Sequence, residues 1–208
     1  MTSRPVPTYV VHFTHVSHLA TIATKGLLSD TAAKAAGLLS IEVGNQEIKA
    51  ARRSRLVDMP PGGAVADYAP FYFAPRSPMM YAIAKGNVPT YKDGCEELIY
   101  LITTVERLIE LHLRTVFTDR NAALAFTTFA NDSAKLDNLI DWQLMKERMW
   151  NNTPEQPDRM ERRMAECLVH QRVPWSAFLD VTARNSTCAR QARQLLATVD
   201  SGVRHVSR

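Results

Sequence analysis

The sequence predicts an α/β fold of the α+β kind, in which a mixed β-sheet flanked by helices forms one domain over residues 1–208. Helical and strand patterns alternate irregularly, which favours a largely antiparallel or mixed sheet over a regular succession of strand–helix–strand units. Hydrophobic residues make up 46% of the chain and charged residues 22%, as in globular proteins that bury a sizeable core.

The first part of the chain contains a strand and two helices. The apolar run at residues 8–14 predicts a short strand. An amphipathic helix is expected from Val16 to Lys25, and Gly26 ends it because glycine favours the position after a helix C-terminus. A second helix is expected from Asn45 to Arg53, and the Pro60–Gly63 cluster after it predicts a loop.

The segment Asp67–Tyr81 is the most informative, with five aromatic residues and three prolines. Residues 71–73 can form a strand, and prolines then force a turn before a helix from Met79 to about Lys85. Arg76 and Ser77 at this turn supply a cation and a hydroxyl, which suit binding of a phosphate or ribose. A core strand with a stiff exit is the alternative interpretation.

The second half continues the mixture of strands and helices. Apolar runs predict strands at residues 97–103 and 114–118, and residues 166–170 read either as a strand or as a helix end. Helical patterns cover residues 104–111, 121–130 and 187–198, residues 151–158 predict a loop, and a further strand or turn is expected around 173–178.

Charge and composition restrict the location and the partners. The net charge is +4, and basic residues gather at 49–55 and 159–163, which favours a phosphate-rich ligand, although such runs are usually solvated helix faces. No apolar run approaches the ~20 residues of a membrane span, residues 1–7 lack the apolar centre of a signal peptide, and the three cysteines are scattered. We therefore expect a cytoplasmic protein without a membrane partner.

Two familiar kinds of site are not expected. The GxGxxG fingerprint is absent, which argues against a Rossmann domain and hydride transfer. His12, His15 and His18 are spaced by three, but the predicted change from strand to helix falls among them, so the histidines do not share one face. We expect no metal ion.

Four segments in order resemble the DarT family, bacterial toxins that transfer ADP-ribose from NAD onto DNA bases in single strands. The segments are Val10–His15, Asp67–Tyr81, Val116–Arg120 and Arg162–His170, and the resemblance runs from about Tyr9 to about Leu179. The resemblance implies the ADP-ribosyltransferase fold, in which a split-sheet cleft binds NAD without the glycine fingerprint.

The resemblance implies two catalytic residues. Glu166 matches an Ala-Glu-x-Leu-Val pattern, and a carboxylate inside an apolar run is costly unless it is paired or functional. Such a carboxylate can stabilise the oxocarbenium-like centre formed when the nicotinamide–ribose bond breaks. Arg52 matches the family's arginine in a basic helix before a Pro-Gly loop, with Arg53 as the alternative if the register shifts by one.

Further side chains are assigned to the two substrates. His12 and Thr14 are implied to line the NAD cleft, although a strand histidine bonded to backbone is the alternative for His12. The other expected NAD contacts are Arg52, Tyr72, Arg76, Ser77 and Tyr81. The residues expected to face the DNA base are Met79, Thr118, Asp119, Arg120 and Asn121.

The function implied is NAD-dependent ADP-ribosylation of thymine in single-stranded DNA by the toxin of a toxin–antitoxin system, of the phage-defence type. Guanine is the alternative acceptor, and transfer to RNA or protein, or a catalytically inactive nucleic-acid-binding module, are rival functions. NAD serves as the ADP-ribose donor. The expected partners are single-stranded DNA and a separate DarG-like macrodomain antitoxin, since no macrodomain fits in this chain.

Overall fold

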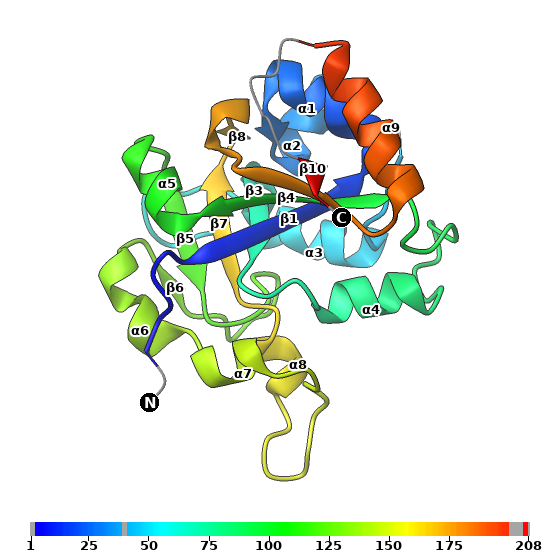
Figure 1. Ribbon diagram of the computed structural model, residues 1–208. Coiled ribbons are helices and arrows are strands. Elements are labelled where there is room, and N and C mark those ends of the chain that lie inside the picture. The colour runs from blue at the N-terminus through cyan, green and yellow to red at the C-terminus, as the bar shows by residue number, and fades with distance from the viewer. Residues whose placement is uncertain (1–2, 39–40, 200–205, 208) are drawn as a thin grey trace.

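The main feature of the computed structural model, which describes residues 3–38, 41–199 and 206–207, is one mixed β-sheet (Figure 1). Its eight strands follow the order β10-β9-β4-β1-β3-β7-β5-β6, and all pairings are antiparallel except that of β10 with β9. The strands are β1 (Tyr9–His15), β3 (Tyr68–Tyr72), β4 (Leu98–Thr104), β5 (Thr115–Thr118), β6 (Phe129–Ala130), β7 (Glu166–His170), β9 (Asp180–Ala183) and β10 (Val206–Ser207). The mixed sheet predicted from the sequence is confirmed.

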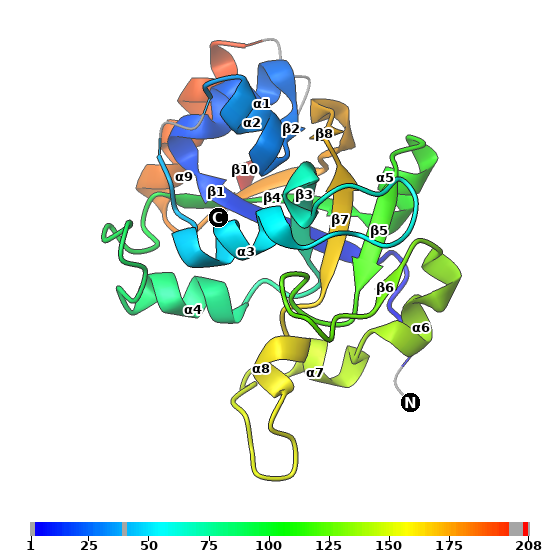
Figure 2. The same cartoon turned by 180° about the vertical axis from the view of Figure 1, so that it is seen from behind.

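Helices cover both sides of this sheet. Figures 1 and 2 show α1 (Leu19–Lys25) and α9 (Ser186–Ala197) together on one side, and α4 (Pro78–Ala84) on the other. The remaining helices are α2 (Asp30–Ala35), α3 (Gln46–Ser54), α5 (Val105–Glu110), α6 (Leu136–Leu139), α7 (Trp142–Lys146) and α8 (Arg159–Arg162), with short 3-10 turns at 16–18, 65–67, 133–135 and 175–177. The main core packs α1 and α9 against the sheet and extends to α5, α6 and α7, and a smaller cluster around Ile83 and Tyr91 lies under α4.

A second, two-stranded sheet joins β2 (Leu27–Leu28) to β8 (Arg172–Val173). It fixes the end of α1 against the segment that follows β7. In the described part of the chain, no helix is long and apolar enough to cross a bilayer.

The large sheet is split between β1 and β3. β1 pairs with β4 along its whole length, from Tyr9 to His15, but meets β3 at a single pair, Val11 with Tyr72. The Pro70 carbonyl accepts a hydrogen bond from His12 Nδ1 (2.8 Å), so this edge of β3 faces β1. Because proline has no N–H, the backbone of β3 offers no donor there, and the two strands diverge. The divergence opens a cleft.

Most elements predicted from the sequence are confirmed within one or two residues. Asn45 begins α3 by accepting hydrogen bonds from the Glu47 and Ile48 N–H groups, and Ser77 caps α4 in the same way through the Met80 N–H. Residues 166–170, which allowed two interpretations, form strand β7. The predicted strand at 71–73 begins earlier, at Tyr68.

The helix predicted at residues 121–130 is wrong. This segment forms turns and ends in the short strand β6. Its alanines favour a helix, but the Ala122 N–H donates to Glu166 Oε1 (3.0 Å), and the Thr128 N–H donates to Asp119 Oδ1 (2.9 Å). These tertiary hydrogen bonds use donors that a helix would need for its own backbone, so they override the local propensity.

Substitution of Gly26 should destabilise the fold more than substitution of Gly37, a second glycine with a positive φ. The φ of +83° and ψ of 166° at Gly26 lie in a region reserved for glycine, and a Cβ there would approach the Val173 carbonyl oxygen to 2.6 Å. We expect Gly26→Ala to lower the free energy of unfolding by about 3 kcal/mol, a drop of about 6–12 °C in melting temperature.

The control is Gly37→Ala. Gly37 also has a positive φ, +63°, but among the described residues, its two chain neighbours aside, no atom lies within 4 Å of its Cβ position. The left-handed conformation alone costs about 1–2 kcal/mol. Equal melting temperatures for the two variants would contradict the steric argument.

Candidate active site

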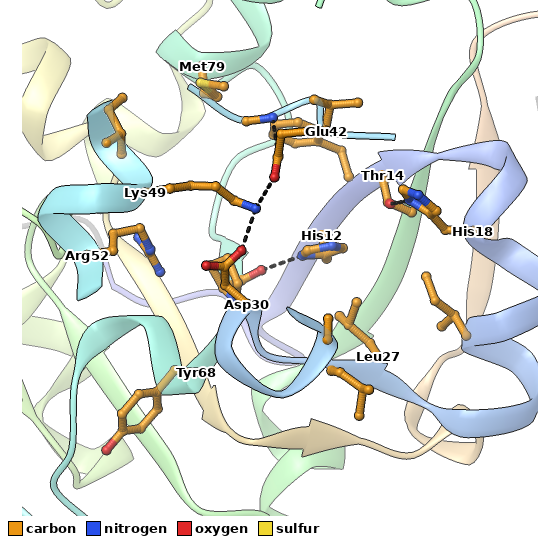
Figure 3. Close-up of a pocket in the computed structure, with 18 of the residues that line it drawn as sticks. His12, Thr14, His18, Leu27, Asp30, Glu42, Lys49, Arg52, Tyr68 and Met79 are labelled. Atoms are coloured by element: carbon orange, nitrogen blue, oxygen red, sulfur yellow. Dashed lines mark hydrogen bonds and ion pairs between the residues drawn. The ribbon is translucent and has the colours of Figure 1, made fainter. Parts of the chain in front are cut away.

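The cleft between β1 and β3 contains a cavity of about 230 Å³, shown in Figure 3. Its walls come from β1, α1, α2, α3, β3 and the segment 41–45, so distant parts of the chain meet there. Apolar side chains such as Leu27 and Ile48 form much of the lining, and a few polar groups converge on it. This combination is typical of a small-molecule site.

The buried ion pair between Arg52 and Glu166 lies at one wall of the cavity. Glu166 is the first residue of β7, opposite Tyr72 of β3, and has no exposed surface. Arg52 Nη1 donates to both carboxylate oxygens, at 3.0 and 2.9 Å. Arg52 lines the cavity, and its Nη2 is buried without a hydrogen-bond partner among the described residues. That nitrogen is a donor available to a ligand.

Backbone contacts fix the glutamate itself. The Ala122 N–H donates to Glu166 Oε1 (3.0 Å), and the Glu166 N–H donates to Thr118 Oγ1 (3.0 Å). Thr118 Oγ1 in turn donates to the Arg120 carbonyl (2.7 Å). The carboxylate therefore has three hydrogen bonds and a cationic neighbour, which offset the cost of burying its charge.

His12 projects from β1 into the cavity as a neutral ring. Its Nδ1 carries the proton donated to the Pro70 carbonyl, which leaves Nε2 as an acceptor. The pKa of His12 falls from 6.5 to about 4, chiefly because burial disfavours the charged form. The hydrogen bond to Pro70 opposes this shift of the pKa, and electrostatic interactions with His18 and Arg52 add to it. The ring thus bonds to backbone and also lines the cavity, and its contact with NAD stays a prediction.

Thr14 and His18 also line the cavity, whereas His15 points elsewhere. Thr14 Oγ1 lies 3.0 Å from His18 Nδ1, and His18 Nε2 accepts from the Ile41 N–H (3.3 Å), which ties the segment 41–45 to β1. His15 Nε2 instead contacts Glu97 (3.1 Å). In the described part of the chain, no group of His, Cys, Asp and Glu side chains is arranged to hold a metal ion.

Tyr72 completes the wall next to the catalytic candidates. Its ring stacks on Phe13, with centroids 6.1 Å apart. Burial raises the pKa of Tyr72, and the negative charge of Glu166 raises it further, while Arg52 opposes the shift. The hydroxyl is therefore a hydrogen-bond donor at neutral pH.

The cavity lining also contains a cluster of charged side chains that was not predicted from the sequence. Lys49 of α3 pairs with Asp30 of α2 and with Glu42, and all three side chains line the cavity (Figure 3). In the sequence, Lys49 stands out only as part of the basic run at residues 49–55. Its partners lie 7 and 19 residues away in the chain, so no local pattern reveals the cluster.

Three residues predicted to bind NAD lie outside the cavity lining. Arg76 is exposed, and its carbonyl accepts a hydrogen bond from Arg163 Nε (3.4 Å). Ser77 is 1% exposed, with its hydroxyl engaged as the cap of α4. Tyr81 is 53% exposed and packs edge-on against Trp150. Arg76 and Ser77 directly precede α4 and Tyr81 lies within it, whereas Met79 is the residue of that helix that lines the cavity.

The predicted base-facing residues divide in a similar way. Met79 and Asn121 line the cavity. Thr118 lies behind Glu166 as its hydrogen-bond partner. Arg120 forms ion pairs with Asp119 (3.1 Å) and, more weakly, with Asp158 and Glu161 (3.5 and 3.4 Å), so its charge is already balanced.

Comparison of the sequence with known proteins shows the family to which this chain belongs. The model of a family described as "ssDNA thymidine ADP-ribosyltransferase, DarT" matches residues 11–207. The chain belongs to the DarT family. A DNA ADP-ribosyl transferase of Mycobacterium tuberculosis is 35% identical over 205 residues, which cover 97% of this chain and 86% of the relative.

Two solved structures of DarT from Thermus sp. 2.9 resemble the fold closely. The complex with ADP-ribosylated single-stranded DNA matches with a TM-score of 0.89 at 29% identity, covering 99% of this chain and 95% of that one. The complex with NAD+ matches with a TM-score of 0.87 at 29% identity, covering 99% and 98%. The family resemblance and the fold predicted from the sequence are confirmed. The chain is an NAD-dependent DNA ADP-ribosyltransferase.

Neighbouring arginines allow a direct test of the register. Arg52 contacts buried Glu166, whereas Arg53 pairs with Asp30 (2.9 Å) near the surface. We expect Arg52→Gln to slow DNA labelling at least about 100-fold, because it removes a preorganised cation from the reacting centre. Arg53→Gln should change the rate only a few-fold, since exposed ion pairs contribute little. Initial rates with radiolabelled NAD+ measure both, and an inactive Arg53→Gln beside an active Arg52→Gln would reverse the assignment.

The low pKa of His12 makes stability depend on pH. Between pH 6.5 and about 4 the unfolded chain binds a proton at this residue that the folded chain does not, so the free energy of unfolding falls as the pH falls. The loss from His12 reaches at most about 3 kcal/mol.

His12→Asn retains an N–H for the Pro70 carbonyl and should flatten this dependence, as measured by urea unfolding at pH 7, 5.5 and 4.5. Other histidines still titrate in both proteins, so the difference between the two curves is the quantity to compare. Parallel curves would show that His12 does not carry the effect.

Proposed function

We propose that this chain transfers ADP-ribose from NAD+ to a ring nitrogen of thymine in single-stranded DNA. The observation that carries the proposal is the buried Arg52–Glu166 pair, held by the Ala122 N–H at the wall of the split-sheet cavity. A fixed carboxylate next to a small apolar cavity suits a reaction that develops positive charge on a sugar.

The reaction breaks one bond and forms another. The bond between the nicotinamide nitrogen and ribose C1′ breaks, its electron pair leaves with neutral nicotinamide, and C1′ becomes oxocarbenium-like. The thymine ring nitrogen loses a proton and bonds to C1′. Glu166 stabilises the developing positive charge electrostatically and accepts the proton from the base. Arg52 lies between this carboxylate and the cavity, so direct contact of substrate with Glu166 requires Arg52 to turn aside.

NAD+ takes its contacts from the cavity wall in this proposal. His12 Nε2 is an acceptor for a ribose hydroxyl or the nicotinamide amide, Tyr72 is a donor, and Thr14 lies beside them. The buried, unpartnered Nη2 of Arg52 is a donor for a diphosphate or ribose oxygen. Arg76, Ser77 and Tyr81 remain proposed NAD contacts, although they lie outside the cavity lining.

The acceptor base enters beside Met79 and Asn121. Both residues line the cavity, and the Asn121 amide can bond to the pairing edge of a base. Thr118, Asp119 and Arg120 stand behind this entrance and hold its backbone, so their proposed role toward DNA is to shape the site. A single strand is required because duplex DNA hides a pairing nitrogen, and extruding the base costs a few kcal/mol.

The biological role is a further part of the proposal. We infer a single-domain toxin over residues 1–208, acting in the cytoplasm and counteracted by a separate DarG-like antitoxin with a macrodomain. The support is membership of the DarT family, whose model matches residues 11–207. Co-expression with a macrodomain hydrolase should restore growth of cells that express the chain.

Oligonucleotides that differ in one feature test the acceptor. We expect mass spectrometry to detect one ADP-ribose on a single strand with one thymine, and none on the same strand annealed to its complement. A strand in which guanine replaces that thymine should remain unmodified. Labelling of the thymine-free strand would transfer the assignment to guanine, and labelling of the matching RNA would extend it to RNA.

Glu166→Gln provides the inactive control for these assays. It preserves the side-chain volume, and its amide oxygen can still accept a hydrogen bond from Arg52. Loss of the buried ion pair should lower the melting temperature, so labelling is compared at a temperature where a melting curve shows both proteins folded. Labelling should fall by about 10²–10⁴-fold, the usual contribution of a positioned acid–base group. Normal labelling by a folded Glu166→Gln protein would remove the glutamate from the mechanism.

A further inference from the structure

The segment between β5 and β6 exposes an aromatic ring close to the active site. Phe126 is 88% exposed, more than any other large apolar side chain in the described part of the chain. Its neighbour Thr127 is only 7% exposed. A phenylalanine in this position keeps its apolar surface in water, which is unfavourable for the isolated protein.

Hydrogen bonds at both ends show that this exposure belongs to an ordered loop. Thr127 Oγ1 donates to the Asn121 carbonyl (2.7 Å), and the Thr128 N–H donates to Asp119 Oδ1 (2.9 Å). These two bonds close the loop upon itself. The ring of Phe126 therefore projects from a backbone that is fixed on either side.

A third contact joins the loop to the catalytic helix. Arg55, three residues after Arg52, donates from Nη2 to the Ala125 carbonyl (3.2 Å), and its guanidinium lies 5.5 Å from the ring centre of Phe129. Figure 2 shows the connection from β5 to β6 beside α3 and in front of β7. Phe126 thus follows directly after a residue held by Arg55, the residue that ends the helix carrying Arg52.

The N-terminal end of this loop lies at the candidate active site. Asn121 lines the cavity, and the next N–H along the chain, that of Ala122, donates to Glu166. Phe126 itself does not line the cavity. The acceptor base must approach Glu166, which has no exposed surface, whereas Phe126 is almost fully exposed. A base that meets this ring is therefore a neighbour of the acceptor in the same strand.

We propose that Phe126 stacks against the base adjacent to the modified thymine and so fixes the path of the single strand at the mouth of the cavity. This inference rests on the proposed function. Every base has a flat π-face, so an exposed ring binds the neighbour with little regard to its identity. The stacking partner covers the apolar surface that the free protein leaves in water, and the fixed loop reduces the ordering cost of binding.

Binding measurements test the proposal without relying on catalysis. Fluorescence anisotropy of a labelled twelve-nucleotide strand with one central thymine, at a single salt concentration, gives Kd for each variant. Loss of one base–aromatic stack should raise Kd about 5- to 150-fold in Phe126→Ala. Phe126→Trp should remain within a few-fold of wild type because it retains a ring. Affinity for NAD+ should not change in either variant.

Tyr9→Ala is the matched control. Tyr9 is 56% exposed and also aromatic, but it lies on β1 at an odd-numbered position, so it points to the sheet face opposite His12. Its removal should leave Kd for the strand unchanged. An equal increase in Kd for Tyr9→Ala and Phe126→Ala would show that the loss of affinity is not specific to Phe126, and it would contradict the proposal.

Abasic sites locate the stacked base. An abasic position on one side of the thymine should weaken binding of wild type, yet cause no further loss in Phe126→Ala, because both changes remove the same contact. Additive losses at both sides, or an unchanged Kd in Phe126→Ala, would overturn the proposal. If wild type labels no thymine, the proposed function fails, whereas these Kd comparisons still decide whether Phe126 stacks on a base.

Discussion

The unpaired edge between β1 and β3 is the constraint on which the site depends. A sheet that paired along its full length would close the gap with backbone hydrogen bonds and leave no room for a ligand. Pro70 opposes this closure because it has no N–H to pair with β1, and the His12 ring bonds to its carbonyl instead. The same two residues thus keep the cleft open and place a neutral imidazole in its wall.

In the proposed mechanism, the reaction in the cleft depends on a charged side chain behind the cavity wall. Strand β7 of the half-sheet that begins at β3 supplies Glu166, and α3 supplies Arg52, which lies between this carboxylate and the cavity. Neither residue is tolerable alone in such surroundings, since breaking a buried pair costs several kcal/mol. Electrostatics therefore joins two elements that the backbone hydrogen bonds of the sheet do not connect.

The sequence predicted the parts of this structure that depend on local patterns. The cap of α3 at Asn45, the glycine after α1 and the apolar strands can each be read from a few adjacent residues. The predicted helix at 121–130 failed because its donors serve Glu166 and Asp119, which no local pattern reveals. The contacts of Lys49 with Asp30 and Glu42 were missed for the same reason. The resemblance of four segments to the DarT family led to the choice of Glu166 and Arg52 as catalytic candidates. The structure brings Arg52 into contact with Glu166, whereas Arg53 pairs with Asp30 near the surface.

The complete burial of Glu166 also affects what the enzyme does when no acceptor is bound. Water is present at about 55 M in any solution and reacts readily with oxocarbenium ions, so it is the natural competitor of a DNA base. A carboxylate with no exposed surface, covered by Arg52, cannot activate a solvent molecule for this attack. In the proposed mechanism, shielding the carboxylate therefore favours transfer to DNA over hydrolysis of NAD+, and it links consumption of NAD+ to the binding of a strand.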